Sequence, residues 1–440
     1  MFAEEHHGTA STLIEQKQPT LRYKSSRKMT VPVGDLRLGM YVAELDRPWL
    51  GTPFLFQGFT IETERELELL REYCSKVTID VESTVDFQIK TGSGGKPGPH
   101  TRTTTVSKRS QVVEREITRA QTAHAASSKV IRDIMDDVRL GKAVDTPAAR
   151  EAVTECVDSV IANADALALL TRIREKDEYT SQHSLSVSIL SVALGREMGH
   201  GRKELIEIGL CGLLHDVGKV LVPDEILGKP DRLSADEMEV MKQHTTFGRD
   251  ILLSSSGALL KSVDVAHAHH ERFDGSGYPR GLVEDQITPV TRIVAIADTF
   301  DAITSDRVYA NARTNMDAFR ILSRGRRTHW DPKLVIRFVE AIGIYPAGTA
   351  VELSNQMVGL VIESHPTLKL RPKLLVTHTP NGPLKPPMIV DLATRMQDQF
   401  GRKLQISRVL PPSSASISLH ELRAHGVLEN LHQLPEFGRT

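Results

Sequence analysis

The sequence predicts a mainly α-helical protein with a small α+β domain at the N-terminus and a small β appendage at the C-terminus. Apolar residues recur at helical spacing from about 112 to 343, and short strand-like runs lie on either side of that stretch. A segment rich in Gly, Pro and Thr at about 91–111 cannot bury much apolar area and separates the first two regions. The 440 residues, 40% of them hydrophobic, suffice for two or three globular domains.

Five segments follow from these patterns. They are an N-terminal tail at 1–30, the α+β accessory domain at 31–90, a linker or long loop at 91–111, the helical domain at 112–345, and the β appendage with a C-terminal tail at 346–440. In the accessory domain, apolar runs beginning at Met40, Phe54 and Val77 predict strands, and the charged amphipathic stretch from Thr63 to Cys74 predicts a helix. In the appendage, the runs at 350–353, 357–362, 373–377 and 388–392 predict strands.

Charge and cysteine content exclude several classes of protein. Lys and Arg number 55 and Asp and Glu number 56, so the net charge of −1 provides no overall basic field for binding long nucleic acids. The three cysteines lie far apart without a C-x-x-C pair, which is typical of a reducing compartment. The sequence has no run of about 18 apolar residues and starts with an acidic segment. We therefore expect a cytoplasmic protein without a membrane span.

Histidine is the residue type with an unusual distribution, because seven of the 17 histidines lie between residues 183 and 270. His183 lies on the apolar stripe of a predicted amphipathic helix. His215 and Asp216 lie on a predicted helix that runs from about Glu204 to Lys219 and is apolar nearly all round. Burying a histidine, an aspartate and a lysine within five positions costs free energy unless each has a partner. Core packing is therefore a poor explanation of this pair.

Three further predicted elements add possible metal ligands. Ser234 has capping-box spacing and begins a helix that carries His244, and a helix starting at Leu259 leads to His269 and His270. Asp298 lies inside an otherwise apolar helix, where a metal is the most natural partner for a carboxylate. Five imidazoles and two carboxylates suit two metals bridged by one aspartate. The predicted ligands are His183, His215, Asp216, His244, His269, His270 and Asp298.

These residues stand in motifs that resemble the HD-GYP family of metal-dependent phosphohydrolases. His215-Asp216 matches the pair that gives the family its name, and Gly277-Tyr278-Pro279 matches its second signature. Five separate motifs occur in family order between about 176 and 331, which implies an HD-type helical bundle there. The segment from about Val31 to Val81 resembles the uncharacterised small domain that often precedes HD-GYP in bacterial signalling proteins.

The resemblance implies an enzyme of second-messenger signalling, because family members hydrolyse cyclic di-GMP. It implies a phosphodiesterase that yields linear pGpG, GMP or both by means of a metal-bridged hydroxide. The first of two divalent ions would be held by His183, His215, Asp216 and Asp298. The second would be held by His244, His269 and His270, with Asp216 as the bridge. Iron or manganese is expected, and the sequence does not decide between them, because His/Asp sites of this kind accept several ions and availability decides.

Three residues are expected to act on the substrate. Lys219, one turn beyond His215, is expected to face the pocket and neutralise charge on the phosphoryl oxygens, so that Lys219 and Asp216 are the catalytic residues. By the resemblance, Tyr278 would stack on a base or bond a phosphate. Arg307 matches a phosphate-binding position of the family, although a salt bridge would explain it equally well.

Several residues near these positions are not expected to bind a metal ion. Tyr179 stands where some family members carry a glutamate that recruits a third metal, so two metals are expected here. His267 is left out of the ligand set because its helical position faces away, and Asp301 is expected to support a ligand or the fold. Glu271 and Asp274 either orient a ligand imidazole or cap the loop.

Two other functions stay open at this point. One is a cyclic di-GMP receptor or partner-binding module with little turnover, and the other is an HD-type hydrolase of another nucleotide. Homodimer formation through the polar amphipathic helices at 112–139 and binding of signalling proteins are also open.

Overall fold

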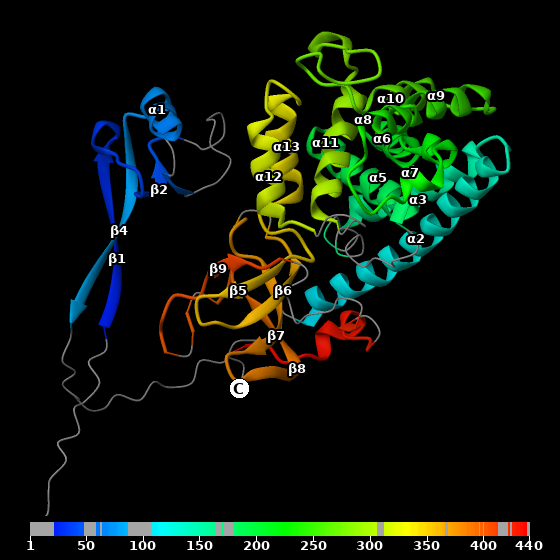
Figure 1. Ribbon diagram of the computed structural model, residues 1–440. Coiled ribbons are helices and arrows are strands. Elements are labelled where there is room, and N and C mark those ends of the chain that lie inside the picture. The colour runs from blue at the N-terminus through cyan, green and yellow to red at the C-terminus, as the bar shows by residue number, and fades with distance from the viewer. Residues whose placement is uncertain are drawn as a thin grey trace, which may run out of the picture. The chain divides into compact units, whose positions relative to one another are not determined.

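The computed structural model describes most of the chain outside the two ends and the region around 87–106. The described residues are 22–47, 59–61, 64–86, 107–163, 165, 169, 179–305, 312–365, 368–395, 397–398, 400–411, 421–422 and 425–437. The chain forms two compact units, residues 1–102 and residues 103–440 (Figure 1). None of the helices in these described ranges is both long enough and apolar enough to cross a lipid bilayer.

The first unit is a four-stranded antiparallel sheet with one helix, as the α+β prediction requires. Its elements are β1 (Arg22–Pro32), β2 (Tyr41–Leu45), β3 (Phe59–Thr60), α1 (Glu64–Tyr73) and β4 (Lys76–Asp86), in the sheet order β1-β4-β2-β3. Leu67 and Leu70 of α1 are buried in one hydrophobic cluster with Val42, Val77 and Ile79 of the sheet. The strand predicted at Phe54 lies outside the described residues.

The prediction of an N-terminal tail at 1–30 is wrong for residues 22–30. These residues belong to β1, which pairs antiparallel with β4 from Arg22 opposite Asp86 to Pro32 opposite Lys76. The strand escaped prediction because its sequence, RYKSSRKMTVP, has no alternating apolar residues over its first seven positions. Its formation depends on backbone pairing with a strand more than forty residues later, which local sequence patterns do not report.

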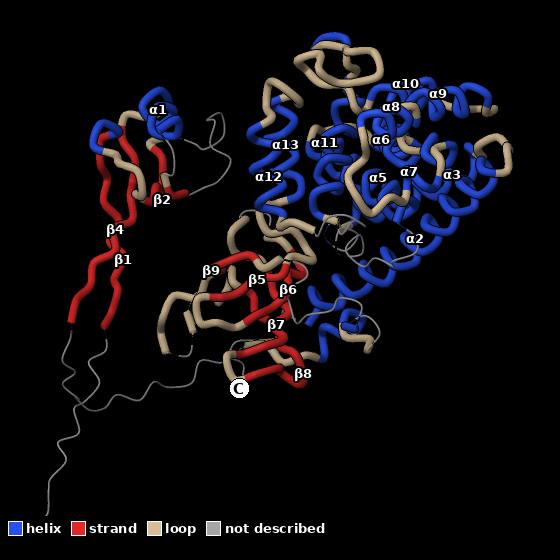
Figure 2. The backbone as a smooth tube through the Cα atoms, in the orientation of Figure 1, coloured by secondary structure: helices blue, strands red, loops and turns tan. Residues whose placement is uncertain are grey.

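The second unit is mainly helical and confirms the predicted fold class (Figure 2). Its long helices are α2 (Ser107–Arg139), α3 (Thr146–Ala162), α5 (Tyr179–Glu197), α6 (Arg202–Leu214), α8 (Ala235–Lys242), α9 (His244–Ser254), α10 (Leu260–Ala268), α11 (Pro289–Thr304), α12 (Asn315–Arg324) and α13 (Pro332–Ile342). The short elements are η3 (Val217–Leu221), α7 (Asp224–Leu227), η4 (Glu284–Gln286) and η6 (Leu428–Gln433). Helix α2 begins inside the segment predicted as a linker.

Helices α5 and α6 form the centre of this unit. Both are buried along most of their length, and their backbones approach closely. A Cβ atom at Gly212 of α6 would lie 2.9 Å from Ser188 Cα of α5, so only glycine allows this contact. The close approach holds the N-terminal half of α5 against the end of α6, where the histidine motif begins.

The structure corrects two predicted helices, and both corrections concern the histidine motifs. Helix α6 ends at Leu214, so the predicted helix from Glu204 to Lys219 is wrong beyond that residue, and the chain continues as the 3-10 helix η3. The Ser234 capping box is confirmed, with Ser234 Oγ accepting from the Glu237 amide at 3.2 Å. However, α8 ends at Lys242, and His244 begins the separate helix α9.

The C-terminal strands form one antiparallel sheet that packs on the helices. Its strands are β5 (Ala350–Leu353), β6 (Val358–Glu363), β7 (Lys373–Thr379), β8 (Gly382–Asp391) and β9 (Ile406–Val409), in the order β8-β7-β6-β5-β9. The four predicted strands are confirmed, and β9 was missed because it is short and partly exposed. Leu360, Ile362 and Leu375 share the buried cluster of the helices, whereas Val361 and Leu374 face a second cluster. The β appendage is therefore part of the same compact unit as the helices.

Candidate metal centre

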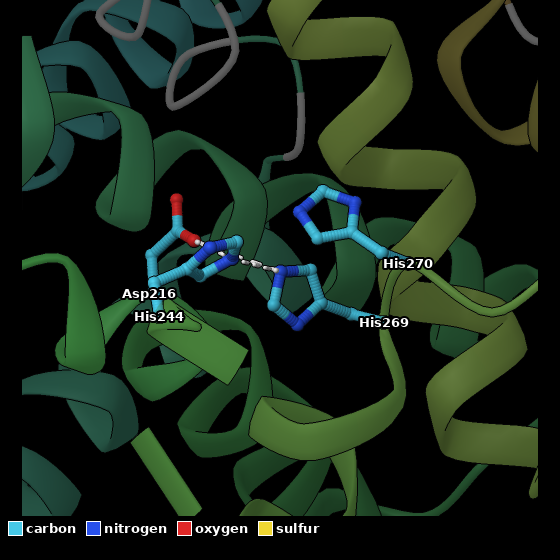
Figure 3. Close-up of side chains that lie close together, drawn as sticks. All are labelled: Asp216, His244, His269 and His270. Atoms are coloured by element: carbon cyan, nitrogen blue, oxygen red, sulfur yellow. Dashed lines mark hydrogen bonds and ion pairs between the residues drawn. The ribbon is translucent and has the colours of Figure 1, made fainter. Parts of the chain in front are cut away.

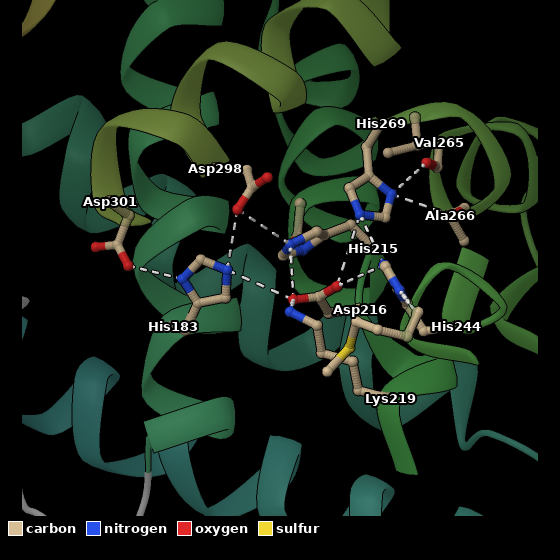
Figure 4. A network of polar contacts seen from close by, with 12 residues as sticks. His183, His215, Asp216, Lys219, His244, Val265, Ala266, His269, Asp298 and Asp301 are labelled. Carbon is tan, nitrogen blue, oxygen red and sulfur yellow. Dashed lines mark hydrogen bonds and ion pairs between the residues drawn. The ribbon is translucent and has the colours of Figure 1, made fainter. Parts of the chain in front are cut away.

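The fold brings all seven predicted ligands together in the second unit. They form two groups, and within each group the ligand atoms all lie within 4.8 Å of one another. The first group is His183, His215 and Asp298, and the second is Asp216, His244, His269 and His270. Figure 3 shows the second group, and Figure 4 shows the polar contacts that connect the two.

Asp216 lies between the two groups and faces both. Its Oδ2 atom is 3.5 Å from His183 Nε2 and 3.3 Å from His215 Nε2. Its Oδ1 atom is 3.5 Å from His244 Nε2 and 3.6 Å from His269 Nε2. Each carboxylate oxygen thus belongs to a different group, which is the arrangement that a bridging ligand needs (Figure 4).

Helix ends place most of these side chains. His215 is the C-cap of α6, Asp216 precedes η3, His244 begins α9, and His269 is the C-cap of α10. Adjacent residues inside a regular α-helix point about 100° apart. The end of α6 at Leu214, followed by Asp216 with φ −103° and ψ 10°, allows two adjacent side chains to face one centre.

Hydrogen bonds outside the centre fix the ligand imidazoles. In four of them, Nδ1 donates to an oxygen outside the two groups, so Nε2 points inward as the ligand atom. The acceptors are Asp301 Oδ2 at 2.7 Å for His183, Gly212 O at 2.8 Å for His215, Met241 O at 2.6 Å for His244, and Val265 O at 3.1 Å for His269.

The centre contains buried acceptor atoms that have no hydrogen-bond donor, and a bound cation would satisfy them. His215 Nε2 and Asp216 Oδ1 are buried without a hydrogen-bond partner among the described residues. The Nε2 atoms of His244 and His269 lie 3.4 Å apart and face the same region. Imidazole nitrogens and carboxylate oxygens are ligands of several divalent metals, iron and manganese among them. The two groups therefore have the donor atoms that divalent metal binding requires.

The electrostatics favour the ionised form of both carboxylates. Burial opposes the charge of Asp216, but the neighbouring His215 and Lys219 outweigh burial and hold the pKa of this carboxyl well below its usual range. For Asp298, hydrogen bonding and charge from His183 likewise outweigh burial and hold its pKa well below the usual range. Both side chains are therefore in the form that binds metal.

The imidazoles differ from one another in protonation. Burial lowers the pKa of His215, and it lowers the pKa of His244 to about 3, so these two are neutral. At His183, hydrogen bonds to Asp216, Asp298 and Asp301 outweigh burial and raise the pKa to about 10. His183 is therefore protonated in the metal-free protein, with Nε2 3.1 Å from Asp298 Oδ1, and a metal held by the first group would take the place of that proton.

Lys219 lies directly beside the bridging carboxylate. Its Nζ atom is 2.5 Å from Asp216 Oδ2, and 22% of its side chain is exposed. Lys219 thus lies next to the two ligand groups. Its contact with substrate stays a prediction.

Tyr278 packs against one of the ligands. Its ring stacks on His270 with centroids 4.8 Å apart and an interplanar angle of 28°. Its amide donates to the carbonyl of His270 at 3.3 Å. Burial, together with the charges of Asp298 and Asp216, raises the pKa of the phenol, so Tyr278 keeps its proton.

Glu271 and Asp274 cap the Gly-Tyr-Pro loop, which decides between the two roles that the sequence left open. The buried Glu271 carboxylate accepts from the amides of Arg280 at 2.7 Å and Leu282 at 2.9 Å. Asp274 Oδ1 accepts from the amide and hydroxyl of Ser276. A Cβ atom at Gly277 would lie 2.5 Å from Glu271 Cα, so the loop folds tightly over Glu271.

A second loop, residues 325–330, holds the Gly-Tyr-Pro loop from another side. The carbonyls of Thr328 and His329 accept from the amides of Asp274 at 2.9 Å and Phe273 at 3.3 Å. Sequence reasoning missed this support. In the same loop, a Cβ atom at Gly325 would overlap the ring of Trp330.

Of the other predicted residues, one can be checked against the structure and two cannot. His267 belongs to neither ligand group, as predicted, and its Nε2 lies 3.5 Å from an Arg249 guanidinium nitrogen. The side chains of Tyr179 and Arg307 lie outside the described residues, so their predicted roles are untested.

Asp301 is the residue that the structure allows us to test most cleanly outside the ligand set. Asp301→Ala removes the acceptor of His183 Nδ1–H, so we expect metal affinity to fall about 10- to 100-fold with little change in helix content. Calorimetric titration of metal-free protein measures the affinity, and circular dichroism measures the helix content. Asp250→Ala, which removes an exposed carboxylate paired with Arg249, is the matched control. Equal metal affinity in the two variants would show that Asp301 does not position His183.

Comparisons with known proteins agree with this geometry. The family model described as "HD domain" matches residues 168–334, and a domain of unknown function (DUF3391) matches residues 28–149. The cyclic di-GMP phosphodiesterase PA4108 of Pseudomonas aeruginosa is 37% identical over 82% of this chain and 88% of its own length. A cyclic di-GMP phosphodiesterase of Thermotoga maritima is 40% identical over 44% of this chain and 52% of its own.

A third relative is named for a different cyclic dinucleotide. The 3'3'-cGAMP-specific phosphodiesterase 2 of Vibrio cholerae is 36% identical over 39% of this chain and 33% of its own. The relative from Pseudomonas aeruginosa is matched over both units, and the two ligand groups lie within the region of the HD domain match. The chain therefore belongs to the HD-GYP family of HD-domain phosphodiesterases.

Proposed function

We propose that this chain is a metal-dependent phosphodiesterase that hydrolyses cyclic di-GMP to linear pGpG, GMP or both. The observation that carries the proposal is Asp216, whose two oxygens face two separate groups of buried ligands beside the Gly-Tyr-Pro loop. The identity of 37% with a cyclic di-GMP phosphodiesterase over most of both chains supports the choice of substrate.

The proposed reaction is hydrolysis of a phosphodiester. An O–P bond forms from water, the bond from phosphorus to the 3′ oxygen breaks, and a proton goes to that oxygen. Two divalent ions, when bound, lower the pKa of water to near neutrality and offset the charge of the phosphodiester.

The residues of this chain prepare the site for that reaction. Asp216 supplies one oxygen to each ligand group, and Lys219 adds a positive charge beside Oδ2. Tyr278 keeps its proton and stands next to the ligand His270, so its hydroxyl can donate to a phosphate oxygen and its ring can contact a guanine base.

The alternative substrate is another cyclic dinucleotide, because a relative named as specific for 3'3'-cGAMP matches the same region at 36% identity. The receptor reading predicts loss of some ligand positions, whereas all seven predicted ligands of this chain lie in the two groups.

The test is product chromatography with purified protein loaded with Fe(II) or Mn(II) and given cyclic di-GMP or 3'3'-cGAMP separately. We expect pGpG or GMP from cyclic di-GMP, at a rate at least about tenfold above that with 3'3'-cGAMP. Faster hydrolysis of 3'3'-cGAMP would establish the alternative substrate. Binding of cyclic di-GMP without product, with either metal present, would establish the receptor.

A further inference from the structure

Lys242 places a second positive charge near the metal centre, at its outer edge. It is the last residue of α8 and stands two positions before the ligand His244. Its Nζ atom lies over the ring of Tyr278, 5.5 Å from the ring centroid. Because that ring stacks on His270, Lys242 is next to the centre but separated from it by an aromatic side chain.

The present partner of Lys242 is easily exchanged. Nζ also contacts Glu239 Oε1 at 2.6 Å, in a pair on one helix that leaves 33% of the lysine side chain and 69% of the glutamate side chain exposed. Exposed pairs of this kind contribute little to stability. A phosphate that approached Tyr278 from solvent would therefore compete well with Glu239 for the ammonium group.

Lys219 and Lys242 differ in depth. Lys219 contacts the buried Asp216, whereas the half-buried Lys242 lies over the Tyr278 ring and pairs with Glu239. A cyclic dinucleotide carries two phosphodiester groups, and only one of them can be at the metal centre at a time. The other needs a positive charge some distance from the metals.

We propose that Lys242 binds the second, non-reacting phosphate of the cyclic dinucleotide, beside the ring of Tyr278. The inference rests on the proposed function, because it assumes a substrate with two phosphodiesters. It makes Lys242 a specificity residue that favours cyclic dinucleotides over substrates with one phosphate.

Tyr278 can separate a phosphate at Lys242 from a phosphate at the metal centre, because its loop is held in place by hydrogen bonds. Its amide bonds to His270 O, and the loop around it is closed by the Glu271 carboxylate. Among the described residues, Arg272 is a competing cation, since its charge also acts on Tyr278. Its side chain is exposed and no contact of its guanidinium with the Tyr278 ring is found in the described structure, so Lys242 is the better candidate.

The test compares Lys242→Ala with two other variants on two substrates, using the metal-loaded full chain. Cyclic di-GMP has two phosphodiesters, and bis(p-nitrophenyl) phosphate has one. For Lys242→Ala we expect KM for cyclic di-GMP to rise about tenfold, which is the size of effect expected when one charge-assisted hydrogen bond is lost. We expect kcat and bound metal to stay unchanged. Its kcat/KM for bis(p-nitrophenyl) phosphate should equal that of the wild type.

Lys229→Ala is the matched control, because Lys229 lies near the same helix and its Nζ makes a comparable pair with Glu237 at 2.7 Å. We expect wild-type kinetics from it. Arg272→Ala tests the competing cation. An effect on KM in Arg272→Ala but not in Lys242→Ala would overturn the proposal. So would an equal loss on both substrates in Lys242→Ala, which would mean a structural role. Failure of the wild type to hydrolyse cyclic di-GMP would instead overturn the proposed function.

Discussion

Replacing Asp216 with alanine is expected to lower kcat for cyclic di-GMP by at least about 1,000-fold, or about 4 kcal/mol of activation free energy. The same variant should lose most of its bound metal. Asp216 is fully buried, and its two oxygens face the two ligand groups at 3.3 to 3.6 Å. Alanine removes the ligand that the groups share and the negative charge between them. Elemental analysis and product chromatography measure the two losses.

Lys219→Ala separates the ligand role from the electrostatic role. Lys219 contacts Asp216 Oδ2 but supplies no ligand atom to either group. We expect it to retain both metals while its rate falls about 10- to 100-fold, the range of a lost charge contact. If Lys219→Ala lost metal as completely as Asp216→Ala, the division of roles between these two residues would be wrong.

Gly218→Ala is expected to destabilise the second unit by about 3 kcal/mol or more and to reduce metal content. A Cβ atom at Gly218 would overlap His244 O and Gly248 N and would lie 2.9 Å from Gly248 Cα. All three are backbone atoms of α9, so no side chain can move aside. Separating η3 from α9 would also separate Asp216 from His244.

The measurements for this variant are thermal unfolding and metal per chain, with Gly201→Ala as the control. A Cβ atom at Gly201 would have Glu204 Oε2 as its nearest neighbour, at 3.8 Å, and the residue caps α6 with an ordinary φ of −73°. The control should cost about 1 kcal/mol or less. Equal stability of the two variants would show that the contact between η3 and α9 tolerates a side chain.

Much of the site was predictable from sequence because its ligands lie in strongly apolar segments. A histidine or carboxylate among buried residues needs a partner, and His215, Asp216 and Asp298 stand in such segments. The order of the motifs along the chain then identified the family. Helix α11 illustrates the reasoning, since Asp298 is flanked by buried residues and does lie beside His183.

The helix breaks at the ligands were not predictable in the same way. Residues 204–219 continue a helical pattern in sequence, and so do residues 235–244. Beyond Leu214 the chain continues as η3, and Gly218 of η3 packs against the backbone of α9, a contact between segments about thirty residues apart. Helical periodicity is a local signal and does not report such contacts.

The supporting residues depend on distant contacts as well. Asp301 could be placed near the centre because it is one turn from Asp298, but its bond to His183 joins α11 to α5. The loop at 325–330 holds the amides of Phe273 and Asp274 through backbone carbonyls only. Backbone acceptors are present at every residue, so the sequence contains no side-chain signal for this support.

A metal titration tests the central claim most directly. Metal-free protein is given Mn(II) in steps from zero to three equivalents, and bound metal and the rate of cyclic di-GMP hydrolysis are measured at each step. Two ligand groups joined by Asp216 predict a rate that lags behind metal uptake over the first equivalent and reaches its plateau at two bound ions per chain. A plateau at one or three ions, or no hydrolysis product at any metal content, would contradict a two-metal phosphodiesterase.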